Sequence, residues 1–398
     1  MLRKQQTLVE FAKNFGPAWL VMMADVDAAS IITGLQDGSS WGYRMVFVML
    51  ALTIPLFIVQ DAAGRLGVAG GMGLAKAIKE KYGGRIATLA AIPMGVSDFL
   101  EYVAEYAGIA IGLSILGLPI VAGVAAAYAA HTFIVLFKKY RQAEIILLPI
   151  SFLLVGSILG SLGFLNINLH TLLSTGFTPL QPYSDPGYDY LLAASIGSVI
   201  MPWMLYFHSG ADARRNKPLS SLRSERMETL IGAFISEALM AAIVVVGAHI
   251  PMGDTLLGVD SFANILPQLG DNTHILIGLG FLFAGFLALV VISLGSAWGV
   301  LEAIGRESRS SFLAVYIVES LPAVALVLFV SSYVQLMLTL MVIYTIIIVP
   351  SLYFLGRVVS DSVLLGHAKY ARGEIMLYWA MVLFIVFGGA LGVYSILF

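Results

Sequence analysis

The chain has 398 residues, of which 59% are hydrophobic and 12% are charged, and its mean hydropathy is +0.91. Soluble domains are about 45–50% apolar and about 25% charged, so this composition excludes a soluble protein and indicates a polytopic membrane protein. The 22 basic and 24 acidic residues leave no cationic excess to neutralise phosphates, which excludes a nucleic-acid partner. The absence of cysteine excludes disulfides and thiolate metal sites.

Apolar segments long enough to cross a bilayer as helices, about 20 residues each, recur along the whole chain. Eleven such spans are expected, at residues 17–36, 45–62, 86–115, 119–137, 143–164, 190–209, 229–250, 274–303, 311–330, 333–356 and 375–397. No remaining segment is long and polar enough for a soluble domain. The sequence therefore predicts one all-α transmembrane domain over residues 1–398, with loops at 165–189 and 251–273.

The basic residues predict the orientation of these spans. With the N-terminus in the cytoplasm, 21 of the 22 Lys and Arg residues fall in cytoplasmic segments, and only Arg44 lies outside. Cytoplasmic loops are enriched in Lys and Arg, so the pattern predicts a multi-pass protein of the plasma or inner membrane. An odd number of spans then places the C-terminus outside.

The first span carries two acidic residues near its middle, Asp25 and Asp27. Ionisable groups at membrane depth cost about 2.5–3.5 kcal/mol each on insertion scales, so they indicate a functional site. Acids two residues apart do not share a helical face. We expect the small residues Ala28, Ala29 and Ser30 to leave the helix, so that both carboxylates reach one cavity. The alternative is a pair of acids that face a water-filled crevice for structural reasons.

A second break is expected in the sixth span. Pro202 lacks an amide hydrogen and clashes with the preceding turn, so the helix should unwind near Ser198–Met201. Carbonyls freed at membrane depth are tolerated where they line a cavity or bind a ligand. Met201 lies next to this break. His208 follows one turn beyond Pro202 and is expected to be either a proton relay or a structural histidine.

The third span carries Asp98, Glu101 and Glu105 at spacings that align on one helical face. Three acids on one stripe must face an aqueous path or one another. Glu105 is favoured as functional, whereas for Asp98 and Glu101 a position near an interface stays open as the alternative. The other acids at membrane depth are weaker candidates: Glu237, Glu302 and Glu319. Of these, Glu302 is expected at the interface. The remaining histidines are expected near loops or helix ends and receive no role: His131, His170, His249, His274 and His367.

No catalytic motif is present in the sequence. There is no GxSxG, HExxH or Gly-Lys-Ser/Thr phosphate loop, and the Gly-rich run at 70–76 lacks the Walker spacing. We therefore expect neither an enzyme nor a bound cofactor. A secondary transporter or channel remains.

Several runs resemble the Nramp family of divalent-metal transporters. GPAWLVMMADVDAASIITGLQDGSSWGY is similar to the family's first helix, and GSVIMPWMLYFHS is similar to its sixth-helix Met-Pro-His motif. Further matches are RLGVAGGMGLAKAI and AEYAGIAIGLSIL, and the resemblance covers essentially the whole chain. It implies the LeuT fold: two inverted five-helix repeats at about 17–164 and 190–356, an eleventh helix at about 375–397, and first and sixth helices unwound at the ion site.

The resemblance also implies a metal site. Asp27 stands at the family's metal-binding Asp, Ser30 at its Asn, Met201 at the metal-binding Met, and Ser198 at the position that lends a carbonyl. Glu105 matches an acid of the proton network, and His208 matches the second sixth-helix His. The full set of additional site or coupling residues is Asp25, Glu101, Glu105, His208 and Glu237.

This sequence departs from the family pattern at several positions. Pro-Gly-Asn is replaced by Ala28, Ala29 and Ser30, and the His after Met-Pro is replaced by Trp203. The tenth-helix Gln and the ninth-helix arginine pair are also missing, at Val342 and at Val315 and Tyr316. The missing arginines and His belong to the proton pathway, so proton coupling is in doubt. The substitutions are similar to those of the Nramp-related magnesium transporters.

These features indicate a monomeric transporter in the lipid bilayer. They leave three kinds of substrate open. A thioether ligand suits Mn²⁺, Fe²⁺ or Cd²⁺, so Met201 favours a transition metal carried into the cytoplasm. The loss of an amide at Ser30, with Asp25 and Glu237 nearby, favours Mg²⁺, which prefers oxygen ligands. An Na⁺-coupled organic solute is the third possibility, although Asp25 and Asp27 would repel an anionic one. A receptor or scaffold without transport is disfavoured.

Overall fold

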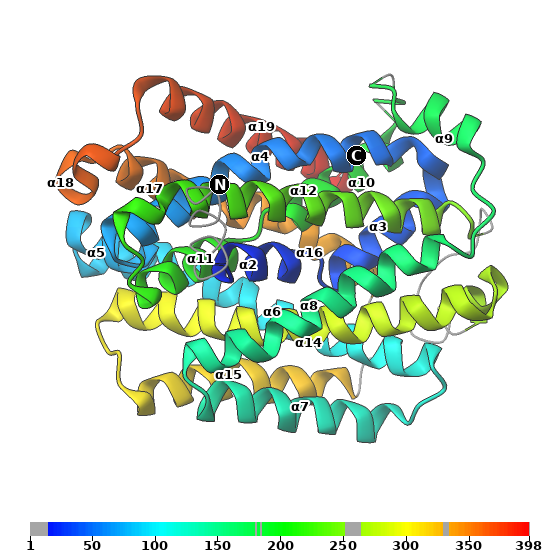
Figure 1. Cartoon of the computed structure of the whole chain (residues 1–398), viewed down its shortest axis with the longest axis horizontal. Coiled ribbons are helices and arrows are strands. Elements are labelled where there is room, and N and C mark those ends of the chain that lie inside the picture. Colours follow the sequence, from blue (N-terminus) through cyan, green and yellow to red (C-terminus); the bar gives the residue numbers. More distant parts are fainter. Residues whose placement is uncertain (1–14, 180, 184, 251–263, 329–333, 398) are drawn as a thin grey trace, which may run out of the picture.

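The computed structural model describes residues 15–179, 181–183, 185–250, 264–328 and 334–397, and every regular element in these ranges is helical. In Figure 1 the long helices run side by side, with α7 and α15 along one edge and α19 along the opposite edge. The α-helices are α2 (Pro17–Asp25), α3 (Ala28–Trp41), α4 (Val46–Arg65), α5 (Leu74–Tyr82), α6 (Gly84–Ile115), α7 (Ile120–Phe137), α8 (Tyr140–Leu162), α9 (Leu169–Gly176), α10 (Pro186–Val199), α11 (Pro202–Arg215), α12 (Leu222–Gly247), α14 (Asp271–Ile304), α15 (Arg309–Val327), α16 (Val334–Ile347), α17 (Val349–Val359), α18 (Ser362–Leu365) and α19 (Arg372–Leu397).

Ten helical runs among the described residues are long and apolar enough to cross a membrane. The first of them, Ala28–Gly70, has 43 residues. A straight helix of that length would measure about 65 Å, roughly twice the hydrocarbon core. It contains the second half of the first predicted span and the whole of the second. Gly42, with a φ of +62°, and the 3-10 turn Gly42–Met45 separate these two parts.

The predicted loops are only partly irregular. Residues 165–189 include the short helix α9, and α10 already begins at Pro186. In the second predicted loop, residues 251–263 lie outside the described residues, and a 3-10 turn follows at Leu266–Leu269. The first predicted loop therefore lies between long helices, as expected, but it contains a short helix that the sequence does not predict.

The first predicted span is broken, two residues earlier than expected. Helix α2 ends at Asp25, Val26 and Asp27 leave the helix, and Ala28 starts α3. The expectation that residues 28–30 unwind is therefore wrong. The reason is local: the Asp27 carboxylate accepts the backbone N–H of Ser30 at 2.7 Å and caps α3. Asp is a strong N-cap residue, and alanines are the best helix formers.

The second break lies where Pro202 predicts it. Helix α10 ends at Val199, Ile200 and Met201 are extended, and Pro202 is the first residue of α11. Proline is favoured at this first helical position because its missing N–H would have no helical partner there. For the same reason the carbonyl of Ser198, four residues earlier, cannot form its usual helical hydrogen bond.

The two broken helices meet through side-chain hydrogen bonds. The Ser30 hydroxyl donates to the Ser198 carbonyl at 3.1 Å, and the Ser195 hydroxyl donates to Asp37 at 2.8 Å. Both contacts join α3 to α10, the first beside the two breaks and the second further from them. Helix α6 packs equally closely, because a Cβ at Gly108 would overlap the side chain of Ala28. The fold thus brings three helices together at Asp27.

Candidate cation site

Three carboxylates converge at the start of α3. Asp27, Glu101 and Glu105 each offer an oxygen, and these oxygens lie within 4.8 Å of one another. All three side chains are fully buried. Glu105 is fixed by accepting the backbone N–H of Ala28 at 3.2 Å, so Asp27 and Glu105 both bind the N-terminal turn of α3. The partial positive charge of a helix N-terminus stabilises carboxylates there.

Most oxygens of this acid cluster have no partner. Among the described residues, the second oxygen of Asp27 and one oxygen of Glu105 accept no hydrogen bond, and Glu101 interacts only with the Tyr344 hydroxyl, outside ideal hydrogen-bond geometry. None of the ion pairs found within the described ranges of the chain includes these acids. Buried charges are stable when they are paired or coordinate a metal. The cluster is therefore suited to binding positive charge.

Two further acids extend this cluster. The Ser236 hydroxyl donates to one oxygen of Asp25 at 3.0 Å, and the other oxygen has no partner. Both oxygens of Glu237, on α12, also lack a hydrogen-bond partner in the part of the chain that the structure describes. Glu237, Asp27 and Glu101 all repel the negative charge of Asp25. The sequence-predicted acids of α2, α6 and α12 thus face one another from separate helices.

The other predicted ligands lie at the same junction. Ser30 and Ser198 contact each other directly, and the buried Met201 follows three residues after Ser198. The backbone N–H of Met201 donates to the Met204 sulfur at 3.4 Å. A second thioether therefore lies beside the break. The sequence reading overlooked Met204, although its third position in α11 is one from which side chains reach back to the cap.

Unlike Glu101, Asp98 belongs to a different pair of acids. Both side chains are fully buried. Asp98 is repelled by Glu319 of α15, whose carboxylate accepts the Ser296 hydroxyl at 2.8 Å. Glu302, which lies near the end of α14, is buried and is paired with Arg214 at 3.0 Å.

His131 was expected near a helix end without a role, but it is fully buried between helices. Its Nδ1 contacts the hydroxyl of Tyr106 at 2.8 Å, and its Nε2 contacts the hydroxyl of Ser293 at 2.8 Å. The imidazole is buried at low cost because both nitrogens are hydrogen-bonded. These partners lie on α6 and α14, so the sequence around His131 could not indicate them.

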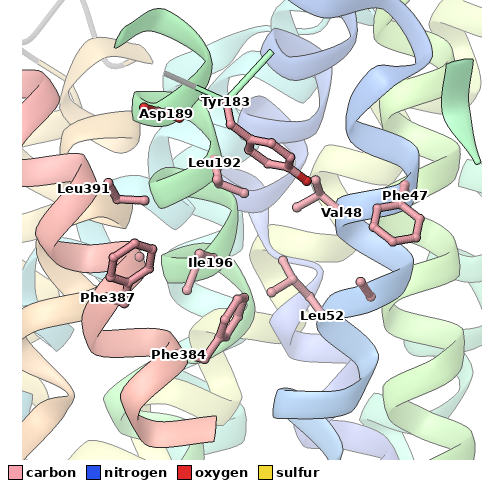
Figure 2. Close-up of a pocket in the computed structure, with 12 residues that line it drawn as sticks. Phe47, Val48, Leu52, Tyr183, Asp189, Leu192, Ile196, Phe384, Phe387 and Leu391 are labelled. Atoms are coloured by element: carbon pink, nitrogen blue, oxygen red, sulfur yellow. The ribbon is translucent and has the colours of Figure 1, made fainter. Parts of the chain in front are cut away.

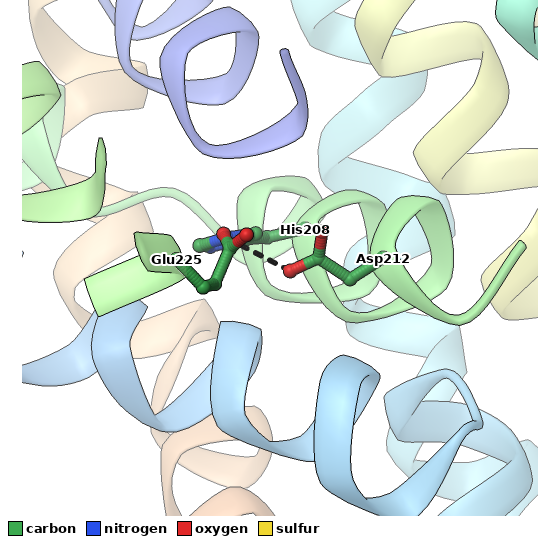
Figure 3. A group of neighbouring side chains, drawn as sticks. All are labelled: His208, Asp212 and Glu225. Atoms are coloured by element: carbon green, nitrogen blue, oxygen red, sulfur yellow. Dashed lines mark hydrogen bonds and ion pairs between the residues drawn. The ribbon is translucent and has the colours of Figure 1, made fainter. Parts of the chain in front are cut away.

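His208 lies in a second cluster, away from the acids at the break (Figure 3). Its ring contacts Gln60 at 3.0 Å, Glu225 at 2.9 Å and Asp212 at 3.5 Å. This trio also has ligand atoms within 4.8 Å of one another. However, the Lys217 ammonium lies 2.8 Å from Asp212 and contacts Glu225. An ammonium therefore occupies the place that a metal ion would take.

Lys217 remains charged in this environment. Burial opposes its charge, but the carboxylates of Asp212, Glu225 and Glu228 outweigh burial and raise the pKa of the Lys217 ammonium above its usual value. The lysine is almost completely buried, as are the three acids. We call Lys217, Asp212, Glu225 and Glu228 the α2 anchor, because Glu228 links it to α2.

The α2 anchor holds the N-terminal end of α2. One oxygen of Glu228 accepts the backbone N–H groups of Gly16 at 2.7 Å and Trp19 at 2.9 Å. Next to it, Arg215 donates to the carbonyl of Phe15 at 3.0 Å and to Glu144 at 3.1 Å. All nine residues of α2 are buried. The molecule is therefore closed around α2 in this conformation.

The apolar pocket in Figure 2 is not the cation site. It has a volume of about 440 Å³ and lies between α4, α10 and α19. Phe384 and Phe387 of α19 face Leu52 of α4 and Ile196 of α10 across it. Among the described residues that line it, Asp189 is the charged one. Its lining does not include Asp27, Glu101 or Glu105, so the pocket is not suited to a divalent cation.

Helices that break in pairs around a buried acid cluster define a membrane transporter of the LeuT fold rather than an enzyme. A manganese transporter of Eremococcus coleocola superposes with a TM-score of 0.79 at 17% identity, covering 96% of this chain and 85% of that chain. MhsT in complex with L-phenylalanine superposes with a TM-score of 0.62 at 13% identity, covering 95% and 98%.

Sequence comparison identifies the family. Residues 18–395 match the family described as natural resistance-associated macrophage protein-like, Nramp, and the chain belongs to it. The divalent metal cation transporter MntH of Pectobacterium carotovorum is 25% identical over 288 residues, which are 69% of each chain. MntH of Xylella fastidiosa is 27% identical over 247 residues, 59% of this chain and 52% of that protein.

Proposed function

We propose that the chain is a secondary transporter that carries divalent metal ions into the cytoplasm by alternating access. The observation that carries the proposal is the group of unpartnered, buried oxygens on Asp27, Glu101 and Glu105 where the two broken helices meet. Asp27 supplies the central charge. The names of the relatives in Pectobacterium carotovorum and Eremococcus coleocola, which refer to divalent metal cations and manganese, support the same substrate class.

The membrane potential is sufficient to drive this transport. With a negative interior, a divalent ion gains about 4.6 kcal/mol per 100 mV on moving inward, twice the value for one charge. We therefore propose that uptake is not coupled to protons. Trp203 supports this proposal, because it replaces a His that belongs to the family's proton pathway. Within the described ranges, the polar contacts of His208 are with Gln60 and with Glu225 and Asp212 of the α2 anchor, and none is with the acids at the break. The distribution of basic residues supports a cytoplasmic N-terminus and an external C-terminus.

Mn²⁺- and Fe²⁺-type ions are the preferred substrates in this proposal. The thioethers of Met201 and Met204 lie at the break, and sulfur favours these ions over Mg²⁺. Mg²⁺ is the alternative, because the clustered donors of Asp27, Glu101 and Glu105 are all oxygens. An anionic organic solute is disfavoured by repulsion from the same carboxylates.

Uptake into proteoliposomes tests the proposed function. Vesicles that contain the purified protein and a metal-sensitive dye receive an inside-negative potassium diffusion potential. Mn²⁺ should enter at a rate that rises with the potential, without a matching entry of protons. Entry of Mg²⁺ but not Mn²⁺ would select the alternative substrate, and no entry of either ion above empty vesicles would refute the proposal.

Replacement of Met201 with leucine tests the thioether as a ligand. Met201→Leu keeps the apolar volume and removes the sulfur, so the Kd for Cd²⁺ and Mn²⁺ should rise by about tenfold or more, the effect of about 1.4 kcal/mol. The Kd for Mg²⁺ should stay the same. Met337→Leu, at an equally buried methionine of α16, is the matched control. An unchanged order of metal affinities in Met201→Leu would exclude the sulfur from the site.

A further inference from the structure

A second pocket lies at one end of the helix bundle, and its chemistry differs from that of the cation site. It has a volume of about 700 Å³. The end of α7, the start of α8, the ends of α11 and α14 and the start of α15 all contribute to it. These helix ends lie together at the left of Figure 1. They include the predicted cytoplasmic segments, where a membrane protein meets the lipid headgroups.

The rim of this pocket is basic. Lys138, Lys139, Arg214 and Arg309 line it together with one acid, Glu307. Arg214 is neutralised by Glu302 and stacks over Trp298 at 4.0 Å. By contrast, none of the ion pairs between described residues includes the other three bases. The pocket therefore has uncompensated positive charge suited to an anion.

The floor of the pocket is apolar and continues to the outer surface of the bundle. Leu294, Trp298 and Leu301 of α14 line it from the inside. Phe137 at its edge is 64% exposed, and Phe133, one turn earlier on α7, is 53% exposed. The Lys138 ammonium lies over the Phe133 ring at 4.9 Å. A long lysine that extends from apolar surface to the headgroup level is typical of a membrane interface.

We propose that this pocket binds an anionic phospholipid. The phosphate lies among Lys138, Lys139 and Arg309, and the acyl chains follow Phe133 and Phe137 along α7. Basic pockets between transmembrane helices recognise acidic lipid headgroups in this way. The apolar floor and the exposed phenylalanines favour a lipid over a free phosphate ion, which would use only the rim.

Native mass spectrometry of the delipidated full-length protein tests the proposal. Phosphatidylglycerol and phosphatidylcholine with the same acyl chains are titrated separately. The first phosphatidylglycerol should bind at least about tenfold more tightly, since each Lys or Arg near an anionic lipid contributes about fivefold. The variant Lys138→Gln/Lys139→Gln/Arg309→Gln should bind both lipids within about twofold of each other.

A matched control separates the pocket from general surface charge. Lys76→Gln/Arg85→Gln/Lys369→Gln removes the same charge from exposed positions outside the pocket and should keep the preference. Arg309 also donates to the Leu136 carbonyl, so its replacement could disturb the fold. If the triple variant misfolds, Lys138→Gln/Lys139→Gln replaces it in the test. This double variant should lose part of the preference for phosphatidylglycerol. Equal lipid affinities in the unmodified protein, or an equal loss in the control, would overturn the proposal. Displacement of phosphatidylglycerol by millimolar inorganic phosphate would overturn it in favour of a free-phosphate site.

Discussion

Replacement of Asp27 with alanine is expected to abolish divalent-metal uptake. The change removes the carboxylate that lies where both broken helices and α6 meet, and with it a free oxygen for the ion. A contact with a charged ligand contributes about 1.5–3 kcal/mol, so uptake should fall by about 10- to 100-fold or more. Proteoliposome uptake, measured at equal amounts of inserted protein, gives the loss directly.

Asp27→Asn distinguishes the charge of Asp27 from its role as a helix cap. Asparagine caps helices as well as aspartate does, so this variant keeps the hydrogen bond to the Ser30 N–H while it removes the negative charge. Uptake should be lost in Asp27→Asn as in Asp27→Ala, although only the alanine variant should lose stability, by about 1 kcal/mol. Near-normal uptake by Asp27→Asn would show that the carboxylate does not hold the ion.

The second large effect concerns stability. Lys217→Met should destabilise the protein by about 3–5 kcal/mol, because it leaves Asp212 and Glu225 buried without their main cation. Thermal unfolding in detergent should show a lower melting temperature. Lys369→Met, at an exposed lysine, should leave it unchanged.

A compensating variant keeps this test decisive. Lys217→Met/Glu225→Gln removes one negative charge together with the ammonium, so part of the lost stability should return even if the single variant is poorly expressed. A Lys217→Met protein as stable as the unmodified chain would mean that the α2 anchor contributes nothing to stability, and that other contacts hold the end of α2.

The breaks in the helices could be predicted from single residues. Pro202 determines where α11 begins, because a proline lacks the N–H that an interior helical position uses. The first break was predicted in the correct span but two residues too late. The prediction gave weight to the small size of Ala28, Ala29 and Ser30, whereas the capping preference of Asp27 and the helix propensity of alanine decide where α3 starts.

The composition of the acid cluster could be predicted only in part. The spacing of Glu101 and Glu105 placed them on one face of α6, but it could not show that this face meets Asp27. That contact depends on the close approach of α6 to α3 at Gly108. Asp37 was overlooked because its partner, Ser195, lies on a distant part of the chain.

Buried polar groups outside the cluster were the hardest to predict. His131 and Lys217 resemble residues of helix ends when they are read along the sequence, and both are buried by partners from other helices. Lys217 belongs to a basic segment, which predicts orientation in the membrane but gives no information on ion pairs. Only the three-dimensional structure shows that this lysine forms ion pairs with Asp212, Glu225 and Glu228.

Metal binding by the purified protein tests the central claim most directly. Titration calorimetry with Mn²⁺ and Mg²⁺ in parallel, and with Asp27→Ala as the control, measures whether the acid cluster holds a divalent ion. We expect Mn²⁺ to bind in the micromolar range, about −8 kcal/mol, and to lose that binding in Asp27→Ala. Comparable weak binding of both ions would favour the magnesium alternative. No binding of either ion above the background of the variant would contradict a divalent-metal site at Asp27.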